Sequence, residues 1–250
     1  MHTYDRNYFK IALPAALEGL FMILLASTDL IMVGALGALS IAAVSIFLQP
    51  RLILLCFSRS LASSVTLLVS KKAGAGDTIG TADIMKKSLT LCAIFMGLLH
   101  ILFYIFLDDI FYLMGANDEY MAEAMAYGPI ALAAVYVTSL TLILQAVQLG
   151  YGRTSVIMKT NVCGNVVNLA LNALLIFGFG PIPSLGVTGA AIGTLVSTIF
   201  TLGWTAWILK NESFFSGGSY LPDRAYFHRI MPILLSILSE QGSERVGMVL

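Results

Sequence analysis

The sequence predicts an all-α, polytopic membrane protein: a six-helix transmembrane bundle followed by the start of a seventh helix. Of its 250 residues, 58% are hydrophobic and 11% are charged, whereas soluble domains carry about 25% charged residues. The apolar residues also gather in long stretches. Each is long enough to cross a hydrocarbon core of roughly 30 Å, which takes about 20 residues of helix.

The predicted spans run over residues 10–34, 39–70, 86–106, 122–149, 155–178 and 185–209, and a seventh begins near residue 230. Their short connections favour neighbouring helices packed antiparallel. Pro14 and Pro129 lie near predicted helix starts and are expected to be first-turn prolines. Between the fifth and sixth spans, Pro181 and Pro183 exclude a helix and predict a turn.

The longest connection, residues 211–229, is rich in glycine and serine, which is typical of a linker. We therefore expect three parts. Residues 1–210 form an N-terminal six-helix transmembrane bundle, residues 211–229 a cytoplasmic inter-bundle linker, and residues 230–250 the beginning of the seventh helix, in an incomplete second bundle. The polar run from Gln241 to Arg245 needs a partner bundle, because such groups are costly against lipid.

The basic residues lie almost entirely in alternate connections. The connections between spans 1 and 2, 3 and 4, and 5 and 6 contain no Lys or Arg. Cytoplasmic loops are the ones enriched in these residues. We therefore predict a multi-pass protein of the cell (plasma or inner) membrane with a cytoplasmic N-terminus. The basic residues on the cytoplasmic side are Arg6, Lys10, Lys71, Lys72, Lys86, Lys87, Arg153, Lys159, Lys210, Arg224 and Arg229.

Ionisable groups inside membrane spans cost about 2.5–3.5 kcal/mol on insertion scales, so each is a functional candidate. Glu18 and Asp29, eleven residues apart in the first span, lie near one helix face. Asn165, Asn168 and Asn172 form one stripe on the fifth span. Counted from the cytoplasmic ends, Asp29 lies about 28 Å along its helix and Asn172 about 25 Å along its own. Both are therefore expected in the outer half of the bundle.

A carboxylate beside amides in an apolar bundle has two interpretations. It can hold a proton or a small cation, because either one removes the cost of a bare buried charge. Alternatively, the carboxylate and the amides only join helices by hydrogen bonds. The spacing leaves both open.

Other classes of function find less support in the sequence. A membrane-embedded enzyme needs a convergent catalytic set, and no two spans supply one. The cysteines, Cys56, Cys92 and Cys163, have no metal-ligand spacing. We expect no enzyme, no resident cofactor and no nucleic-acid partner.

A series of short motifs extends over the whole chain. They are Thr28-Asp29-Leu30-Ile31-Met32-Val33-Gly34, Gly74-Ala75-Gly76-Asp77, Leu113-Met114-Gly115-Ala116, Asn165-Val166-Val167-Asn168 and Leu185-Gly186-Val187. In their order and spacing the sequence resembles the N-terminal half of the multidrug and toxic compound extrusion (MATE) family, in its NorM-like branch.

The resemblance implies a proton- or sodium-coupled antiporter in the lipid bilayer, which exports drugs or other organic compounds by alternating access. Its substrates would be small and cationic or amphipathic, and a C-terminal bundle would complete it. The resemblance assigns cation or proton coupling to Asp29, Asn168, Asn172 and Glu240, with Asp29 as the ligand when the ion is Na⁺. Some members have Asp at the position of Asn172. The residues expected to line the cavity are Glu18, Gln49, Arg51 and Asn165.

Arg51 and Arg59 depart from the family, which usually has small or apolar residues there. They can be counterions to Glu18 or Asp29, can reach water from a tilted second span, or can form a pocket for an anionic substrate. The last interpretation favours a lipid-linked oligosaccharide flippase of the same superfamily, whose cavity is typically more basic. A further alternative is an inactive, truncated fragment.

Overall fold

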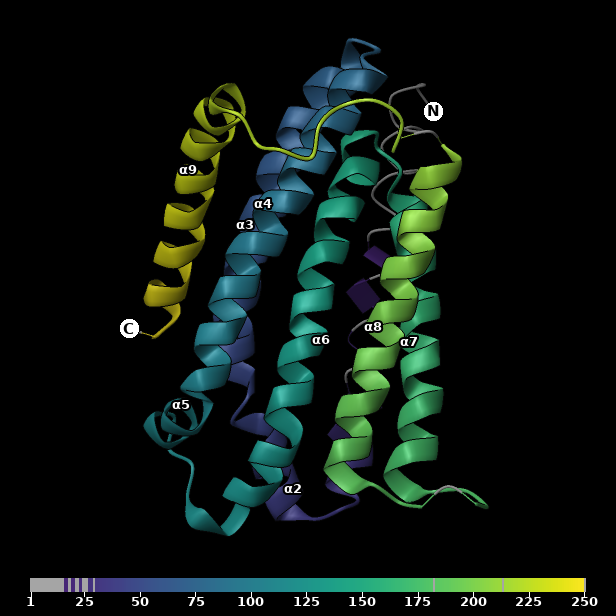
Figure 1. Ribbon diagram of the computed structural model, residues 1–250. Coiled ribbons are helices and arrows are strands. Elements are labelled where there is room, and N and C mark those ends of the chain that lie inside the picture. Colours follow the sequence, from purple (N-terminus) through teal and green to yellow (C-terminus); the bar gives the residue numbers. More distant parts are fainter. Residues whose placement is uncertain are drawn as a thin grey trace.

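Long, closely packed helices form the protein (Figure 1). The computed structural model describes residues 16–17, 19–20, 23, 27–28, 30–181, 183–212 and 214–249, with the backbone alone for 242–249. The helices that follow residue 37 are α2 Ala38–Ser45, α3 Leu48–Gly74, α4 Thr78–Ile105, α5 Leu107–Leu113, α6 Asp118–Gly150, α7 Thr154–Phe177, α8 Gly186–Asn211 and α9 Arg224–Val249.

The all-α membrane class is confirmed. Five stretches of the described chain are long and apolar enough to cross a membrane: Ala38–Gly74, Thr78–Ile105, Asp118–Gly150, Thr154–Phe177 and Gly186–Asn211. They correspond in order to the second to sixth predicted spans. Most of the first predicted span lies outside the described residues. The helix at the seventh predicted span, α9, begins at Arg224 rather than near residue 230.

The third span begins earlier than predicted, at Thr78 rather than residue 86. The Asp77 side chain caps α4 by accepting a hydrogen bond from the Gly80 N–H at 2.7 Å, and Lys72 pairs with the same carboxylate at 2.6 Å. The Lys72 ammonium also lowers the pKa of Asp77. Because the cap starts the helix here, Lys86 and Lys87 lie within α4 and not in the connection before it.

The fourth span also begins earlier than predicted, so the interpretation of Pro129 was wrong. The Asn117 side chain accepts a hydrogen bond from the Glu119 N–H at 3.2 Å and starts α6 at Asp118. Pro129 is therefore an interior residue of α6, where proline removes a backbone hydrogen bond. Pro14 lies outside the described residues.

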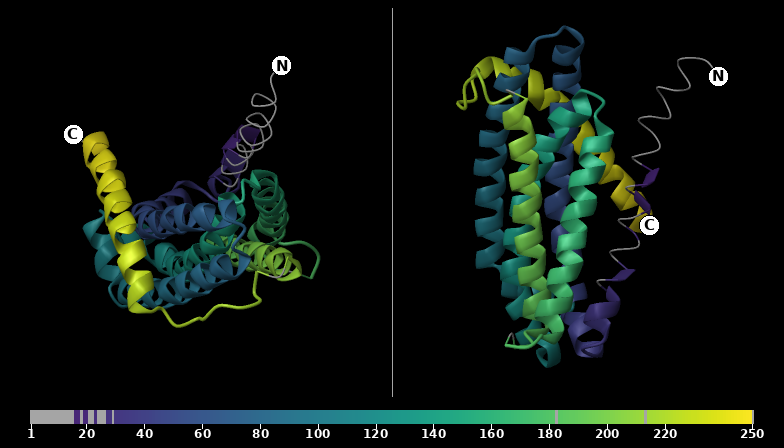
Figure 2. Two further views of the ribbon diagram at one scale, coloured as in Figure 1. Left: turned by 90° about the horizontal axis from the view of Figure 1, so that it is seen from above. Right: turned by 90° about the vertical axis from the view of Figure 1, so that its right-hand side faces the viewer.

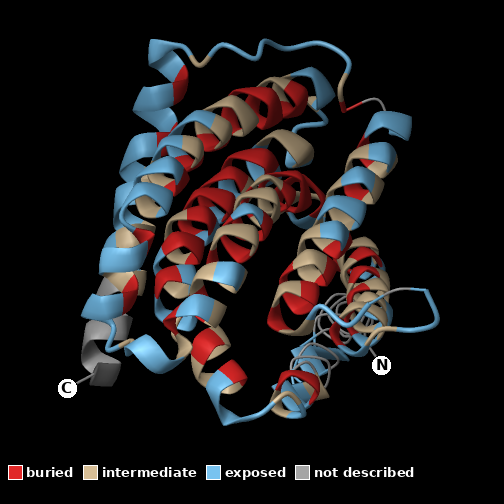
Figure 3. Ribbon diagram, turned by 60° about the horizontal axis from the view of Figure 1, so that its bottom comes forward, coloured by how far each residue is buried: buried red, intermediate tan, exposed pale blue. Residues whose placement is uncertain are grey.

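Helix α6 is the centre of the bundle and packs against α2, α3, α4, α5, α7 and α8. Its inward face supplies the fully buried Ile143 and Val147, and buried residues follow the inner faces of the surrounding helices (Figure 3). On one flank of the bundle lies α9, against α3, while α7 and α8 lie on the other (Figure 2). Small residues allow close approach, since an added Cβ at Gly150 would lie 2.6 Å from Val69 Cγ1.

The basic connections lie together at one end of the bundle in the structure. The α3–α4 and α6–α7 connections and the C-terminal end of α8 lie at one end of the bundle, with α5 and the α7–α8 connection at the other (Figure 1). The first end carries Lys72, Arg153 and Lys210, and the second carries Asp109 and Pro183. By the positive-inside bias, the first end is expected to face the cytoplasm; it is called the cytoplasmic end below.

Cysteines placed singly at these five positions, in a background without the native thiols, test this orientation in intact cells. An impermeant thiol reagent added outside is expected to label positions 109 and 183 and to spare 72, 153 and 210 until the membrane is permeabilised. Labelling of position 153 from outside would contradict the topology.

Candidate functional site: a buried asparagine pair

Two asparagines are buried on α7 where it faces α8. Asn172 is 2% exposed and Asn168 is 7% exposed. The Asn172 Nδ2 donates to Asn168 Oδ1 at 3.3 Å, and the Asn168 Nδ2 donates to Thr194 Oγ1 on α8 at 3.3 Å. The four-residue spacing of the amides puts them on one face of the helix. They form a polar site inside an apolar helix pair.

Glycines on α8 create the space for this site. The place that a Cβ would take at Gly193 is filled by the side-chain oxygen of Asn172. One turn earlier, a Cβ at Gly189 would lie 2.5 Å from the Leu175 carbonyl oxygen. Backbones can approach this closely only where side chains are missing, as is common between membrane helices. The close approach of α7 and α8 seats Asn172 directly against α8.

The structure places the other predicted residues in different surroundings. Asn165 is half-buried on α7, close in sequence to the buried pair. Gln49 and Arg51 are exposed on α3, and Glu240 is exposed on α9. Because α9 and α7 lie on opposite flanks of the bundle (Figure 2), Glu240 and the asparagine pair belong to opposite sides of the bundle. Asp29 and Glu18 lie outside the described residues, so the coupling set stays a prediction.

Thr194 is a site residue that the sequence analysis missed. Its hydroxyl donates to the Ala190 carbonyl of its own helix at 2.9 Å and accepts from Asn168. Threonine commonly bonds to its own helix in this way, so a single threonine in an apolar span gives no functional signal. Its role becomes visible only when α8 is placed against α7.

A second polar contact between helices, also missed, joins α6 to α7. The Gln145 Nε2 donates to Asn161 Oδ1 at 2.6 Å, with Gln145 buried. This contact could have been predicted from the presence of Gln145 in an apolar span, because a buried amide without a hydrogen-bond partner is costly. Both polar sites offer amide and hydroxyl oxygens, which suit a hard cation rather than a softer metal. No cluster of three His, Cys, Asp or Glu side chains among the described residues could hold a metal ion.

Comparison with known proteins identifies the fold and the family. The family model described as MatE matches residues 14–174. The probable multidrug resistance protein NorM of Rhizobium meliloti is 28% identical over 193 residues, which are 77% of this chain and 41% of the relative. The FAD transporter of Shewanella oneidensis is 27% identical over 210 residues, 82% of this chain and 45% of the relative.

A solved structure of a MOP superfamily transporter from Pyrococcus furiosus shares the fold. It aligns with a TM-score of 0.86 at 24% identity, over 97% of this chain and 54% of that one. This chain thus spans about half the length of the relatives it matches. The structure and the MatE match together confirm a multi-pass membrane protein, and because the match covers more than half of its residues, the chain belongs to the MATE family of transporters.

Proposed function

We propose that the chain forms the N-terminal bundle of a cation-coupled antiporter, which exports small organic compounds by alternating access. The observation that carries this proposal is the buried pair of Asn168 and Asn172. Their amide oxygens are suitable ligands for a hard cation, and their N–H groups can stabilise a carboxylate. Asp29, expected at the same depth, would supply the charge that binds H⁺ or Na⁺.

The coupling would work through differential affinity. A bound ion changes a conformational equilibrium only if it binds one conformation more tightly than the other. The asparagine pair joins α7 to α8, and the proposed ligand Asp29 lies on the first span. If α7 and α8 shift relative to the first span, the distance between these ligands changes, and so does the affinity for the ion. Ion binding would then favour one arrangement of the bundle, and substrate release would favour the other. No chemical step is needed, so the proposed activity is transport and not enzyme catalysis.

A second candidate function is export of an anionic compound, such as a phosphate-bearing substrate or a lipid-linked oligosaccharide. Arg51 and Arg59 are exposed on α3, and neither forms an ion pair with any residue that the structure describes. A guanidinium in a membrane span is costly unless it faces water or an anion. One relative is named as an FAD transporter, and FAD carries phosphates.

Efflux from proteoliposomes that contain the complete transporter tests both functions. We expect an imposed proton or sodium gradient to drive export of a cationic dye, and export to stop when the gradient is collapsed. Export of FAD but not of the dye would favour the second candidate. In that case Arg59→Gln should reduce FAD export, whereas Arg229→Gln, which removes an exposed charge from α9, should not. Efflux of the dye without any dependence on a gradient would contradict cation coupling.

A further inference from the structure

The segment between α8 and α9 lies across the cytoplasmic end of the bundle (Figure 1). We call residues 212 and 214–223 the strap. At its start, Glu212 forms an ion pair with Arg153 and accepts a hydrogen bond from Gln148 Nε2 at 3.3 Å. Phe214 is buried, and its ring packs edge to face on Tyr151 at 5.1 Å. The strap is therefore attached to the α6–α7 turn from the beginning.

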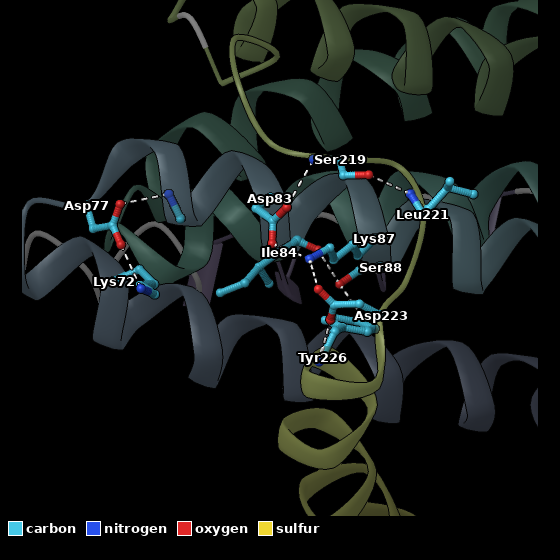
Figure 4. A network of polar contacts seen from close by, with 11 residues as sticks. Lys72, Asp77, Asp83, Ile84, Lys87, Ser88, Ser219, Leu221, Asp223 and Tyr226 are labelled. Carbon is cyan, nitrogen blue, oxygen red and sulfur yellow. Dashed lines mark hydrogen bonds and ion pairs between the residues drawn. The ribbon is translucent and has the colours of Figure 1, made fainter.

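Two neighbouring lysines of α4 hold the strap: Lys86 contacts its middle and Lys87 contacts its end. Lys86 and Lys87 are each only 7% exposed. The Lys86 Nζ donates to the Gly217 carbonyl oxygen at 2.6 Å and lies 5.0 Å from the centre of the Tyr220 ring. The Lys87 Nζ pairs with two carboxylates, Asp83 at 2.7 Å and Asp223 at 2.8 Å (Figure 4).

The glycines of the strap are required by this docking. Gly217 and Gly218 have φ angles of 80° and 69°, which favour glycine. An added Cβ at Gly218 would lie 2.6 Å from the Asp83 Cα. The next residue, Ser219, donates its backbone N–H to Asp83 Oδ1 at 3.0 Å. Glycine and serine, which in the sequence indicate a linker, here fit a specific surface of α4.

The end of the strap connects directly to α9. Besides binding Lys87, Asp223 accepts the Tyr226 N–H at 2.7 Å in the first turn of α9. The hydrogen bond from Lys87 lowers the pKa of Asp223. Tyr226 is 4% exposed, and its hydroxyl shares a 2.8 Å hydrogen bond with Ser88 of α4. Further along α9, Gln241 Oε1 accepts from Ser60 of α3 at 3.2 Å.

We propose that the strap and its Lys87–Asp223 pair form a latch that fastens the start of α9 to α4 and keeps this part of α9 closed against the bundle. Two contacts of different kinds converge on one turn of α4: the ion pair of Asp223 with Lys87 and the hydrogen bond between the buried Tyr226 hydroxyl and Ser88. Each depends on a residue at or after Asp223, so loss of the ion pair should loosen the whole N-terminal half of α9. The proposal concerns docking within this chain and does not depend on the proposed function.

The test measures how readily Ile230 becomes accessible, because this α9 residue is fully buried. A cysteine replaces Ile230, and Cys56 and Cys163 are removed, whereas the fully buried Cys92 of α4 is kept as an internal reporter. A thiol reagent is applied to the full chain in permeabilised membranes. With Lys87→Met or Asp223→Asn, labelling of position 230 should become up to about fivefold faster, because the ion pair has a partly exposed carboxylate and its loss eases local opening.

Lys72→Met is the matched control, since it breaks a 2.6 Å ion pair at the same end of the bundle without touching the strap. It should leave labelling of position 230 unchanged. Unchanged labelling in both Lys87→Met and Asp223→Asn would overturn the latch. Equal acceleration by Lys72→Met, or equally fast labelling of Cys92, would also overturn it, because the effect would then be general loosening of the bundle.

Discussion

Asp29→Asn in the complete transporter is expected to abolish ion-driven efflux while leaving membrane insertion intact. A carboxylate inside a membrane span, where Asp29 is expected, costs about 2.5–3.5 kcal/mol to insert. A bound proton or cation removes that cost. Asparagine inserts more readily but cannot exchange charge with a gradient. Because a ligand drives a conformational change only through differential affinity, a site that no longer binds the ion cannot couple the gradient to transport.

The measurement is substrate efflux from proteoliposomes under an imposed proton or sodium gradient, with the amount of inserted protein determined in parallel. Glu18→Gln is the control on the same span and should have a smaller effect. Asn172→Asp should keep the fold and move the pH dependence of transport, because two neighbouring carboxylates titrate as a coupled pair. Undiminished gradient-driven efflux by Asp29→Asn would reduce Asp29 to a helix-packing residue.

Gly189→Ala is expected to destabilise the bundle strongly. The new Cβ would lie 2.5 Å from the Leu175 carbonyl oxygen and 2.6 Å from its carbonyl carbon. These are backbone atoms, so relief requires α7 and α8 to separate. Overpacking of this kind typically costs about 1–3 kcal/mol. Separation of the helices would also draw Thr194 away from Asn168, so any activity that depends on the asparagine pair should fall too.

Thermal unfolding of the purified chain in detergent, followed by tryptophan fluorescence, measures this effect. Gly203→Ala is the matched control on the same helix, because an added Cβ there meets nothing within 4 Å. It should be neutral or stabilising, by about 1 kcal/mol at most, since alanine favours a helix more than glycine does. Similar melting temperatures for the two variants would show that α7 and α8 are not in the close contact described.

The sequence by itself determined the class of this protein and most of its span order. A bilayer requires long apolar helices and restricts basic residues largely to one side, so both appear in the sequence as simple patterns. The asparagine stripe was also predictable, since the three- and four-residue spacing of Asn165, Asn168 and Asn172 lies within one helix. The structure confirmed that Asn168 and Asn172 are buried together.

Only the tertiary structure decided which partners these helices meet. Thr194 joins the asparagine pair because Gly189 and Gly193 let α8 approach α7, and that approach depends on two helices at once. The burial of Lys86 and Lys87 also depends on a contact between distant segments, because the strap that covers them, with Asp223, lies far along the chain from α4. The bilayer requires each helix separately to be long and apolar, so the helices can be predicted from local sequence. Contacts between helices depend on how two distant segments pack, and no local sequence pattern predicts that.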